Sequence, residues 1–143
     1  MVLVDGAGTP LGAYLDAASP SEVKLLEATL DTVAVRRPGQ PGRPRKRPDR
    51  LIADRGYDSN ALRAAVVRRG IEPIIPAREN NRVATHQDGR TLRRYQRRWI
   101  VERTFSWLGY FRRLVVRDER FLETYAGFFH LACAILTLRV VLK

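Results

Sequence analysis

A basic segment rich in proline and glycine divides the sequence into two parts. Residues 36–50, RRPGQPGRPRKRPDR, contain four prolines, two glycines and seven basic residues. Proline lacks a backbone N–H and cannot continue a helix or a central strand, so the segment is expected to be a loop. Regular structure must therefore come from residues 1–35 and 51–143. The loop is either a solvated connector or a clamp on a DNA backbone, and its density of cations favours the clamp.

The whole chain shares this basic character. Its 143 residues carry 26 lysines and arginines against 15 acidic residues, which gives a formal net charge of +11. Such an excess is typical of proteins that bind phosphate backbones. The length fits one domain with a modest core, or a piece of one. An RNA-binding role is disfavoured, because aromatic residues are only 8% of the chain and show no pattern of a stacking platform.

The sequence favours a cytoplasmic protein. The first ten residues lack the basic and apolar regions of a signal peptide. Cys133 is the single cysteine, so no internal disulfide can form, and its apolar neighbours place it in the core. Residues 128–142 are apolar but contain His130 and Arg139, and the run is shorter than the about 20 residues that span a bilayer. They are expected to form a buried helix, not a membrane helix.

The first 35 residues predict a hairpin followed by a helix. Two short apolar runs, 2–4 and 10–17, flank the turn sequence DGAGT, which indicates a β-hairpin. Residues 19–33 have apolar positions at helical spacing and predict an amphipathic helix. Its inward side chains are expected to be Val23, Leu26, Leu30 and Val33.

The residues after the loop predict a parallel strand–helix–strand unit. LIADRGYD, residues 51–58, begins as a strand that is expected to stop at Asp54. A helix capped by Asp58 or Ser59 follows, and residues 71–77 form the second strand. The inward side chains of this helix are expected to be Leu62, Ala65, Val66 and Val67. Reactive groups collect at the carboxyl ends of parallel strands, which is where Asp54 falls.

Two further helices are predicted at residues 91–110 and 122–142. On the first, Glu102 falls in a polar stripe opposite the apolar side. The stripe consists of Tyr95, Arg98, Glu102, Ser106, Gly109 and Arg113, and the apolar side of Ile100, Thr104, Trp107, Leu108 and Phe111. Glu102 can form an exposed ion pair with Arg98, worth about 0.3–0.5 kcal/mol. It can instead be a ligand of Mg²⁺ or Mn²⁺ together with Asp54, because carboxylates from separate elements hold the ions of two-metal phosphoryl transfer.

Several segments resemble a known family. ADRGYDS, residues 53–59, and YQRRWIVERTFSWLGYFRRL, residues 95–114, are similar to the C-terminal half of bacterial insertion-sequence DDE transposases. The segments VDGAGTPLGAYLDAASPSE and GRPRKRP also match, so the resemblance covers nearly the whole chain. It implies an α/β, ribonuclease-H-like catalytic domain over residues 1–143, truncated at its N-terminus, with residues 36–50 as a basic loop within it.

The resemblance implies roles for individual residues. Asp54 matches the second metal ligand of the family, the aspartate of the D-R-G-Y-D run. Glu102 matches the third, the glutamate of the Y-x2-R-x3-E-x6-K signature, in which Tyr95 and Arg98 also fit. Gly109 stands at the position of the final lysine, so the DNA contact of that lysine is not carried over.

The first metal ligand of the family has no match. In the family it is an aspartate on a strand that precedes the hairpin, and no such strand is present in this sequence. Asp5 lies in the hairpin turn, where aspartate is common for turn reasons alone, and is a poor replacement. The resemblance therefore implies Mg²⁺- or Mn²⁺-dependent DNA strand cleavage and transfer only after the missing N-terminal part is supplied, for example from an upstream reading frame. The isolated chain is expected to be inactive.

Double-stranded DNA at transposon ends is the expected partner. The expected DNA contacts are Arg43, Arg45, Lys46 and Arg47 of the loop and Tyr95 and Arg98 of the helix. The complete protein is expected to be a homo-oligomer, and no membrane is involved. The alternative is a non-catalytic DNA-binding remnant or a regulator of transposition. The incomplete set of carboxylates supports this alternative, whereas the pairing of Asp54 with Glu102 supports the enzyme.

Overall fold

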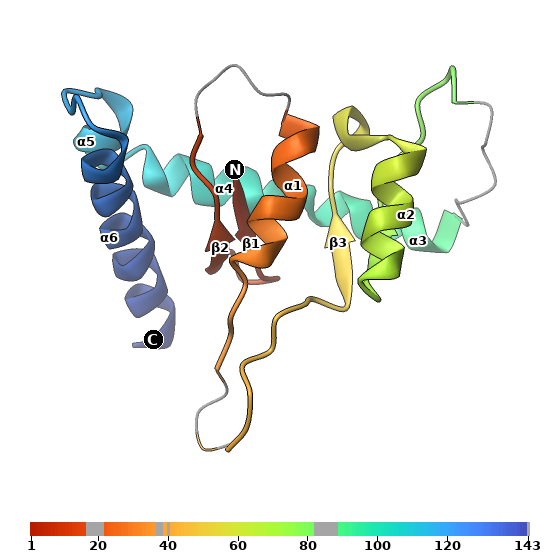
Figure 1. The fold of residues 1–143 in the computed structure, drawn as a ribbon, viewed down its shortest axis with the longest axis horizontal. Coiled ribbons are helices and arrows are strands. Elements are labelled where there is room, and N and C mark those ends of the chain that lie inside the picture. The colour runs from red at the N-terminus through yellow and green to blue at the C-terminus, as the bar shows by residue number, and fades with distance from the viewer. Residues whose placement is uncertain (17–21, 37–38, 40, 82–88, 143) are drawn as a thin grey trace.

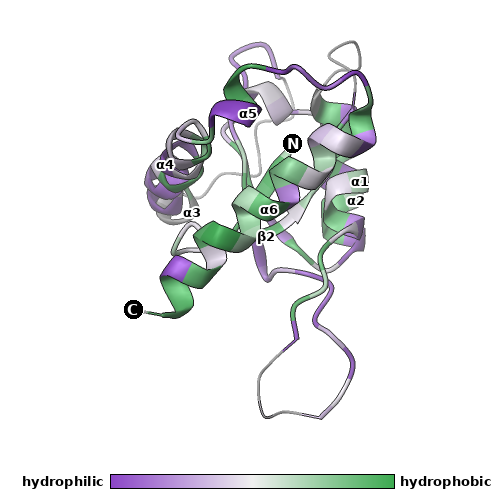
Figure 2. Ribbon diagram, turned by 90° about the vertical axis from the view of Figure 1, so that its left-hand side faces the viewer, coloured by the Kyte–Doolittle hydropathy of each residue, from purple (hydrophilic) through white to green (hydrophobic). Residues whose placement is uncertain are grey.

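The structure, a computed structural model, describes residues 1–16, 22–36, 39, 41–81 and 89–142. Its elements in chain order are β1 (Val2–Val4), β2 (Pro10–Ala13), α1 (Glu22–Asp31), β3 (Arg50–Ile52), the 3₁₀ helix η1 (Arg55–Tyr57), α2 (Asn60–Arg68), β4 (Glu72–Ile74), α3 (Gly89–Arg93), the 3₁₀ helix η3 (Arg94–Arg98), α4 (Trp99–Leu108), α5 (Arg112–Val115) and α6 (Leu122–Val141). They form three layers: α1 and α2 lie on one side of the short strands, and α3 and α4 on the other (Figures 1 and 2).

The strands form two separate pairs. β1 and β2 are antiparallel, with Leu3 opposite Gly12. β3 and β4 are parallel, with Ile52 opposite Ile74. Among the described residues no strand hydrogen-bonds to both pairs. The predicted hairpin, the parallel unit and the α/β class are confirmed, and the ribonuclease-H-like arrangement stays a prediction.

One hydrophobic cluster holds both strand pairs against α1 and α2. Its buried members are Leu26, Leu30, Leu51, Leu62, Val66 and Ile71, and Leu3 of β1 packs against them. The predicted inward positions of both helices are confirmed except Val67, which is 58% exposed. At about 100° per residue Val67 lies about 140° around the helix from Leu62. On the side of α2 where Val67 lies, the buried side chain is that of Arg63.

The helix predicted at residues 91–110 is broken into three pieces. The α-helical winding of α3 gives way to the tighter 3₁₀ winding of η3 before α4 begins. The 3₁₀ piece is where this layer contacts the parallel unit, since Arg94 lies 3.7 Å from Glu72 and Arg98 lies 3.9 Å from Asp54. The prediction of one continuous helix was therefore wrong, because tertiary contacts overrode the local pattern. The apolar side of α4 is confirmed: Ile100, Thr104 and Leu108 are buried.

The prediction of a buried C-terminal helix was wrong. Only Phe129, Ala132 and Leu136 of α6 are buried, whereas Leu131 is 57% exposed and Val141 73% exposed. Figure 2 looks onto the outer side of α6, and much of that side has the colour of hydrophobic residues. The helix has the predicted extent, at 20 residues, and by length and composition it is the one described helix that could cross a membrane. Hydrophobicity indicates which residues can be buried, but not whether a surface is present to bury them.

Cys133 lies on the partly buried side of α6. Its side chain packs against the cluster formed by Val2, Leu108, Phe129, Ala132 and Leu136, without being fully buried. Burial raises the pKa of its thiol to about 11, so the thiol is protonated at neutral pH. The prediction of a core cysteine is confirmed in part, because the side chain packs against the cluster but is only partly buried.

Candidate functional site

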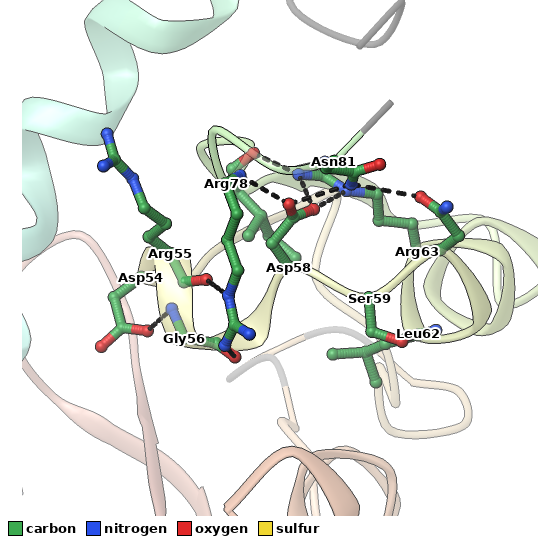
Figure 3. Close-up of polar contacts among 11 residues, drawn as sticks. Asp54, Arg55, Gly56, Asp58, Ser59, Leu62, Arg63, Arg78 and Asn81 are labelled. Carbon is green, nitrogen blue, oxygen red and sulfur yellow. Dashed lines mark hydrogen bonds and ion pairs between the residues drawn. The ribbon is translucent and has the colours of Figure 1, made fainter. Parts of the chain in front are cut away.

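Asp54 follows the end of β3 and caps the 3₁₀ turn η1. Its carboxylate oxygen Oδ1 accepts a hydrogen bond of 2.7 Å from the backbone N–H of Gly56 (Figure 3). The other oxygen, Oδ2, takes no part in this hydrogen bond, and the side chain is 43% exposed. The strand ends at Ile52, two residues earlier than expected, but the predicted position of Asp54 at its carboxyl end holds. Asp54 is therefore fixed on one side and accessible on the other.

Gly56 permits this close approach. A Cβ atom built on Gly56 would lie 2.8 Å from the Asp54 Oδ1 atom, which is closer than real Cβ contacts allow. Any side chain at this position would force the Asp54 carboxylate to move. The requirement for glycine in the D-R-G-Y-D run is thus steric. It does not come from the backbone conformation, because the φ angle of Gly56 is not in the left-handed region.

Arg98 joins Asp54 to Glu102. Its Nη2 atom lies 2.7 Å from Glu102 Oε1, and its Nη1 atom lies 3.9 Å from Asp54 Oδ2. The guanidinium also lies over the ring of Tyr95, 5.8 Å from the centroid. The structure therefore brings four of the residues predicted from sequence to one place. The two carboxylates come from the parallel unit and from α4, and one cationic group lies between them.

Asp54 and Glu102 contribute carboxylate oxygens to this group of side chains. Carboxylate oxygens are hard ligands of the kind that Mg²⁺ and Mn²⁺ prefer. The side chains of Asp54 and Glu102 are 43% and 57% exposed, so both are accessible. Both carboxylates already form ion pairs with the Arg98 guanidinium. In the described part of the chain no group of three or more histidine, cysteine, aspartate or glutamate side chains is placed to bind a metal. The site thus contains two carboxylates and one guanidinium.

Asp5 is held within its own turn. Its Oδ1 atom accepts hydrogen bonds of 2.8 Å from the backbone N–H groups of Ala7 and Thr9. This is the side-chain turn that aspartate commonly makes in hairpins. The turn itself is docked on α4, since Thr104 Oγ1 donates to the carbonyl of Gly8 at 2.9 Å. Asp5 thus shapes the hairpin that packs against the helix carrying Glu102.

The basic loop reaches the parallel unit at the opposite end from Asp54. The loop leads into β3 at Arg50, whereas Asp54 follows the other end of that strand, and Figure 1 shows the loop extending away from the layers. Within it Arg45 forms an ion pair with Asp49, and Arg47 donates to the carbonyl of Arg69 at 3.1 Å. The remaining predicted contacts, Arg43 and Lys46, are exposed. The structure does not bring these cations next to Arg98.

Gly109 ends α4, where it is exposed. It occupies the place of the signature lysine and offers no side chain there.

A buried ion pair beside Asp54 was not predicted from the sequence. Asp58 was a candidate cap of α2, but Ser59 caps that helix and the side chain of Asp58 is fully buried. Arg63 donates to Asp58 Oδ1 through Nε at 2.9 Å and Nη2 at 2.8 Å, and its Nη2 also reaches the carbonyl of Ile75 at 2.6 Å. The signal was an arginine on the inward side of the predicted helix, since a buried cation requires a partner.

The Asp58 carboxylate is ionised in spite of its burial. Burial alone raises the pKa of this group, but hydrogen bonds from the backbone N–H of Arg78 and from the side chains of Asn81 and Arg63 outweigh it. The net effect is a pKa below the usual value of an aspartate. Asp58 is therefore a charged structural group.

Comparison with known proteins identifies the family. The sequence model described as "Transposase DDE domain" matches residues 1–137. The chain belongs to this family of transposases. The transposase described for insertion sequence element IS402 of Burkholderia cepacia is 40% identical over 135 residues, which are 94% of this chain and 60% of that protein. The one described for IS6501 of Brucella ovis is 34% identical over 91 residues, 62% of this chain and 67% of that one.

This transposase chain therefore spans less than two thirds of the IS402 protein. No solved structure matches it significantly. The resemblance inferred from the D-R-G-Y-D and Y-x2-R-x3-E residues is confirmed at the level of the family.

Proposed function

We propose that this transposase domain cleaves DNA at the ends of an insertion sequence and joins it to target DNA, with Asp54 and Glu102 as metal ligands. The observation that carries the proposal is the Arg98 guanidinium placed between the two carboxylates. Side chains from the turn after β3 and from α4 thus converge on one positive charge. Surface ion pairs are common, but a pair contributed by both motif segments of a DDE domain is a specific arrangement.

Two divalent cations, when bound, supply the positive charge that activates the attacking oxygen and stabilises the leaving oxygen of a phosphodiester. The carboxylates of Asp54 and Glu102 would hold such cations, and the N–H of Gly56 orients the carboxylate of Asp54. Arg98 neutralises the two carboxylates, and in the proposal its guanidinium would pair with a DNA phosphate when cations are bound. Tyr95 supports the guanidinium through its ring.

A further strand completes the domain in this proposal. Each strand pair has only two described strands, yet Leu3 of β1 and Leu51 of β3 pack in the same cluster beneath α1. Figure 1 shows β1 on the side of the hairpin that faces β3. A strand inserted between them would satisfy both open edges and could bring its own aspartate beside Asp54. The greater length of the IS402 protein supports the existence of such a segment.

The second candidate is a DNA-binding protein without catalytic activity that regulates transposition. It is supported by the two-ligand site and the net charge of +11. The two candidates are separated by joining the chain to the polypeptide encoded directly upstream and assaying cleavage of transposon-end DNA with Mg²⁺ or Mn²⁺. The catalytic proposal expects cleavage by the fusion and none by the 143-residue chain alone. A fusion that binds the DNA but never cleaves it would favour the regulator.

Binding of DNA by the isolated chain is expected to be strongly dependent on salt. If about five or six phosphates are neutralised, the logarithm of the binding constant should fall with the logarithm of salt concentration with a slope near −5. A fluorescence titration at several salt concentrations measures this slope. A slope near zero would contradict the proposal that basic residues bind the DNA through its phosphates.

Charge reversal in the basic loop tests where this binding occurs. Glutamate at Arg45, Lys46 and Arg47 together is expected to weaken binding equally for all DNA sequences, because phosphate contacts carry no base information. The control has the same change in charge at three exposed arginines around α5, Arg112, Arg117 and Arg120. Equal losses in both triple variants would mean that net charge, not the loop, binds DNA.

Alanine at Gly56 is expected to disturb the site without unfolding the domain. The new Cβ would displace the Asp54 carboxylate, and shifts of supporting groups typically cost about 10–100-fold in metal affinity or activity. The concentration of Mn²⁺ that half-saturates cleavage by the fusion measures this effect. Gly127→Ala is the matched control, since nothing lies within 4 Å of a Cβ there. Equal metal dependence of Gly56→Ala and wild type would show that the carboxylate position is unimportant.

A further inference from the structure

Arg78 clamps the turn that carries Asp54. It lies after β4, and its side chain crosses to η1, where Nε donates to the carbonyl of Arg55 at 3.1 Å and Nη2 to the carbonyl of Gly56 at 2.8 Å (Figure 3). The guanidinium thus donates to two consecutive carbonyls of a single 3₁₀ turn, of which that of Arg55 also accepts from the backbone N–H of Asp58 at 3.2 Å. A one-turn helix has few internal hydrogen bonds, so external donors to its carbonyls largely decide how rigid it is.

One planar peptide group connects Arg78 to Asp54. The carbonyl of Arg55 and the N–H of Gly56 belong to the same peptide unit, and they point in opposite directions because the unit is trans and rigid. Arg78 holds the oxygen end of this unit, and Asp54 Oδ1 accepts from its N–H end at 2.7 Å. Fixing the carbonyl therefore fixes the direction of the N–H that holds the carboxylate.

The clamp is itself anchored in the interior. The backbone N–H of Arg78 donates to Asp58 Oδ2 at 2.7 Å, and Asn81 Nδ2 donates to the same oxygen at 2.9 Å. The other oxygen of Asp58 is held by Arg63, and this ion pair is buried. A continuous set of hydrogen bonds therefore runs from a buried charge pair to the exposed carboxylate of Asp54.

We propose that Arg78 is a positioning residue that orients the Asp54 carboxylate through the peptide unit between Arg55 and Gly56. The inference rests on the proposed role of Asp54 as a metal ligand. It assigns Arg78, an exposed arginine in a basic protein, a role other than contact with DNA phosphate. Two of its side-chain N–H directions are already committed to backbone carbonyls.

The first test measures the turn directly in the 143-residue chain. Arg78→Met keeps the length of the side chain and removes both donors. Amide hydrogen exchange at Gly56 is expected to become about tenfold faster, because the local opening of the turn becomes easier. Exchange in α2 is expected to be unchanged. Arg68→Met, on the exposed surface of α2, is the control and should leave Gly56 at the wild-type rate. Wild-type exchange at Gly56 in Arg78→Met would overturn the inference.

The second test measures metal dependence in the fusion with the upstream polypeptide. Arg78→Met should raise the half-saturating Mn²⁺ concentration by about 10–100-fold, while the rate at saturating Mn²⁺ and the affinity for DNA stay near wild type. Arg78→Lys should recover part of the effect, because one ammonium can still donate to one carbonyl. Weaker DNA binding with unchanged metal dependence would instead make Arg78 a phosphate contact and overturn the inference. If the wild-type fusion does not cleave, the proposed function fails, and the exchange measurement still decides the role of Arg78 in the turn.

Discussion

Asparagine in place of Asp54, or glutamine in place of Glu102, is expected to abolish metal-dependent strand cleavage by the complete protein. Each change removes one anionic ligand, and a bound metal contributes several kcal/mol of transition-state stabilisation, which corresponds to at least about a thousandfold in rate. Folding should be nearly unaffected. Both side chains are about half exposed, and an exposed ion pair such as that with Arg98 is worth only about 0–1 kcal/mol.

The control for these two variants is Glu123→Gln, which changes an exposed carboxylate in the first turn of α6. It should cleave like the wild type. All three variants should bind transposon-end DNA with affinities within about twofold of wild type, because no phosphate contact is lost. Should Glu102→Gln unfold the domain, Glu102 would be a structural ion-pair residue and the catalytic assignment would fail.

The second large effect is expected at Asp58. Alanine at this position should lower the free energy of unfolding by about 3–5 kcal/mol, because it leaves the buried Arg63 guanidinium without its partner. It also removes the acceptor for the backbone N–H of Arg78 and for Asn81. Denaturant unfolding of the isolated chain measures the loss. The double variant Asp58→Leu/Arg63→Met, in which neither charge remains, should be more stable than Asp58→Ala. Equal losses in the two would mean that the ion pair is not the cause.

The same carboxylate gives the fold a dependence on acid. The pKa of Asp58 is lowered in the folded state, so its contribution to stability is present above the pKa of an unfolded aspartate, near 4, and is lost as pH falls through the lower folded value. Wild-type unfolding free energy should therefore fall below about pH 4. Asp58→Asn, which cannot ionise, should be less stable at neutral pH and lose less on acidification.

Local patterns were sufficient to predict much of this fold. The DGAGT turn, the spacing of Leu26 and Leu30, and the strand before Asp54 each depend on neighbours within one element. All three were correct, and for the helix and the strand the same residues that favour the local structure, Leu26, Leu30 and Leu51, also face the shared cluster. Consistency between local preference and tertiary packing is what makes such segments predictable.

The errors arose where distant residues decide the outcome. The 3₁₀ winding of η3 accompanies contacts with Glu72 and Asp54, which are far away in sequence. The role of Asp58 depends on Arg63 and on the segment after β4. The exposure of α6 depends on which surface is available to cover it. None of these can be read from a period of apolar residues along one element.

The candidate site contains one feature that the sequence predicted and another that it did not. The spacing of Tyr95, Arg98 and Glu102 indicated a polar stripe, and the structure adds that Arg98 reaches Asp54 as well. The positioning of Asp54 by Gly56 and Arg78 was not visible in the sequence, because it depends on one peptide unit held from two sides.

The central claim is that Asp54 and Glu102 bind the metal, and locating the metal tests it most directly. Fe²⁺ bound in place of Mg²⁺ generates hydroxyl radicals with ascorbate and peroxide, and these cut the polypeptide close to the ion. In the complete protein the account predicts cuts near residues 54 and 102, competed by Mg²⁺ and lost in Asp54→Asn while DNA binding persists. Cuts near Asp5 and not near Glu102, or cuts that survive in both Asp54→Asn and Glu102→Gln, would contradict it.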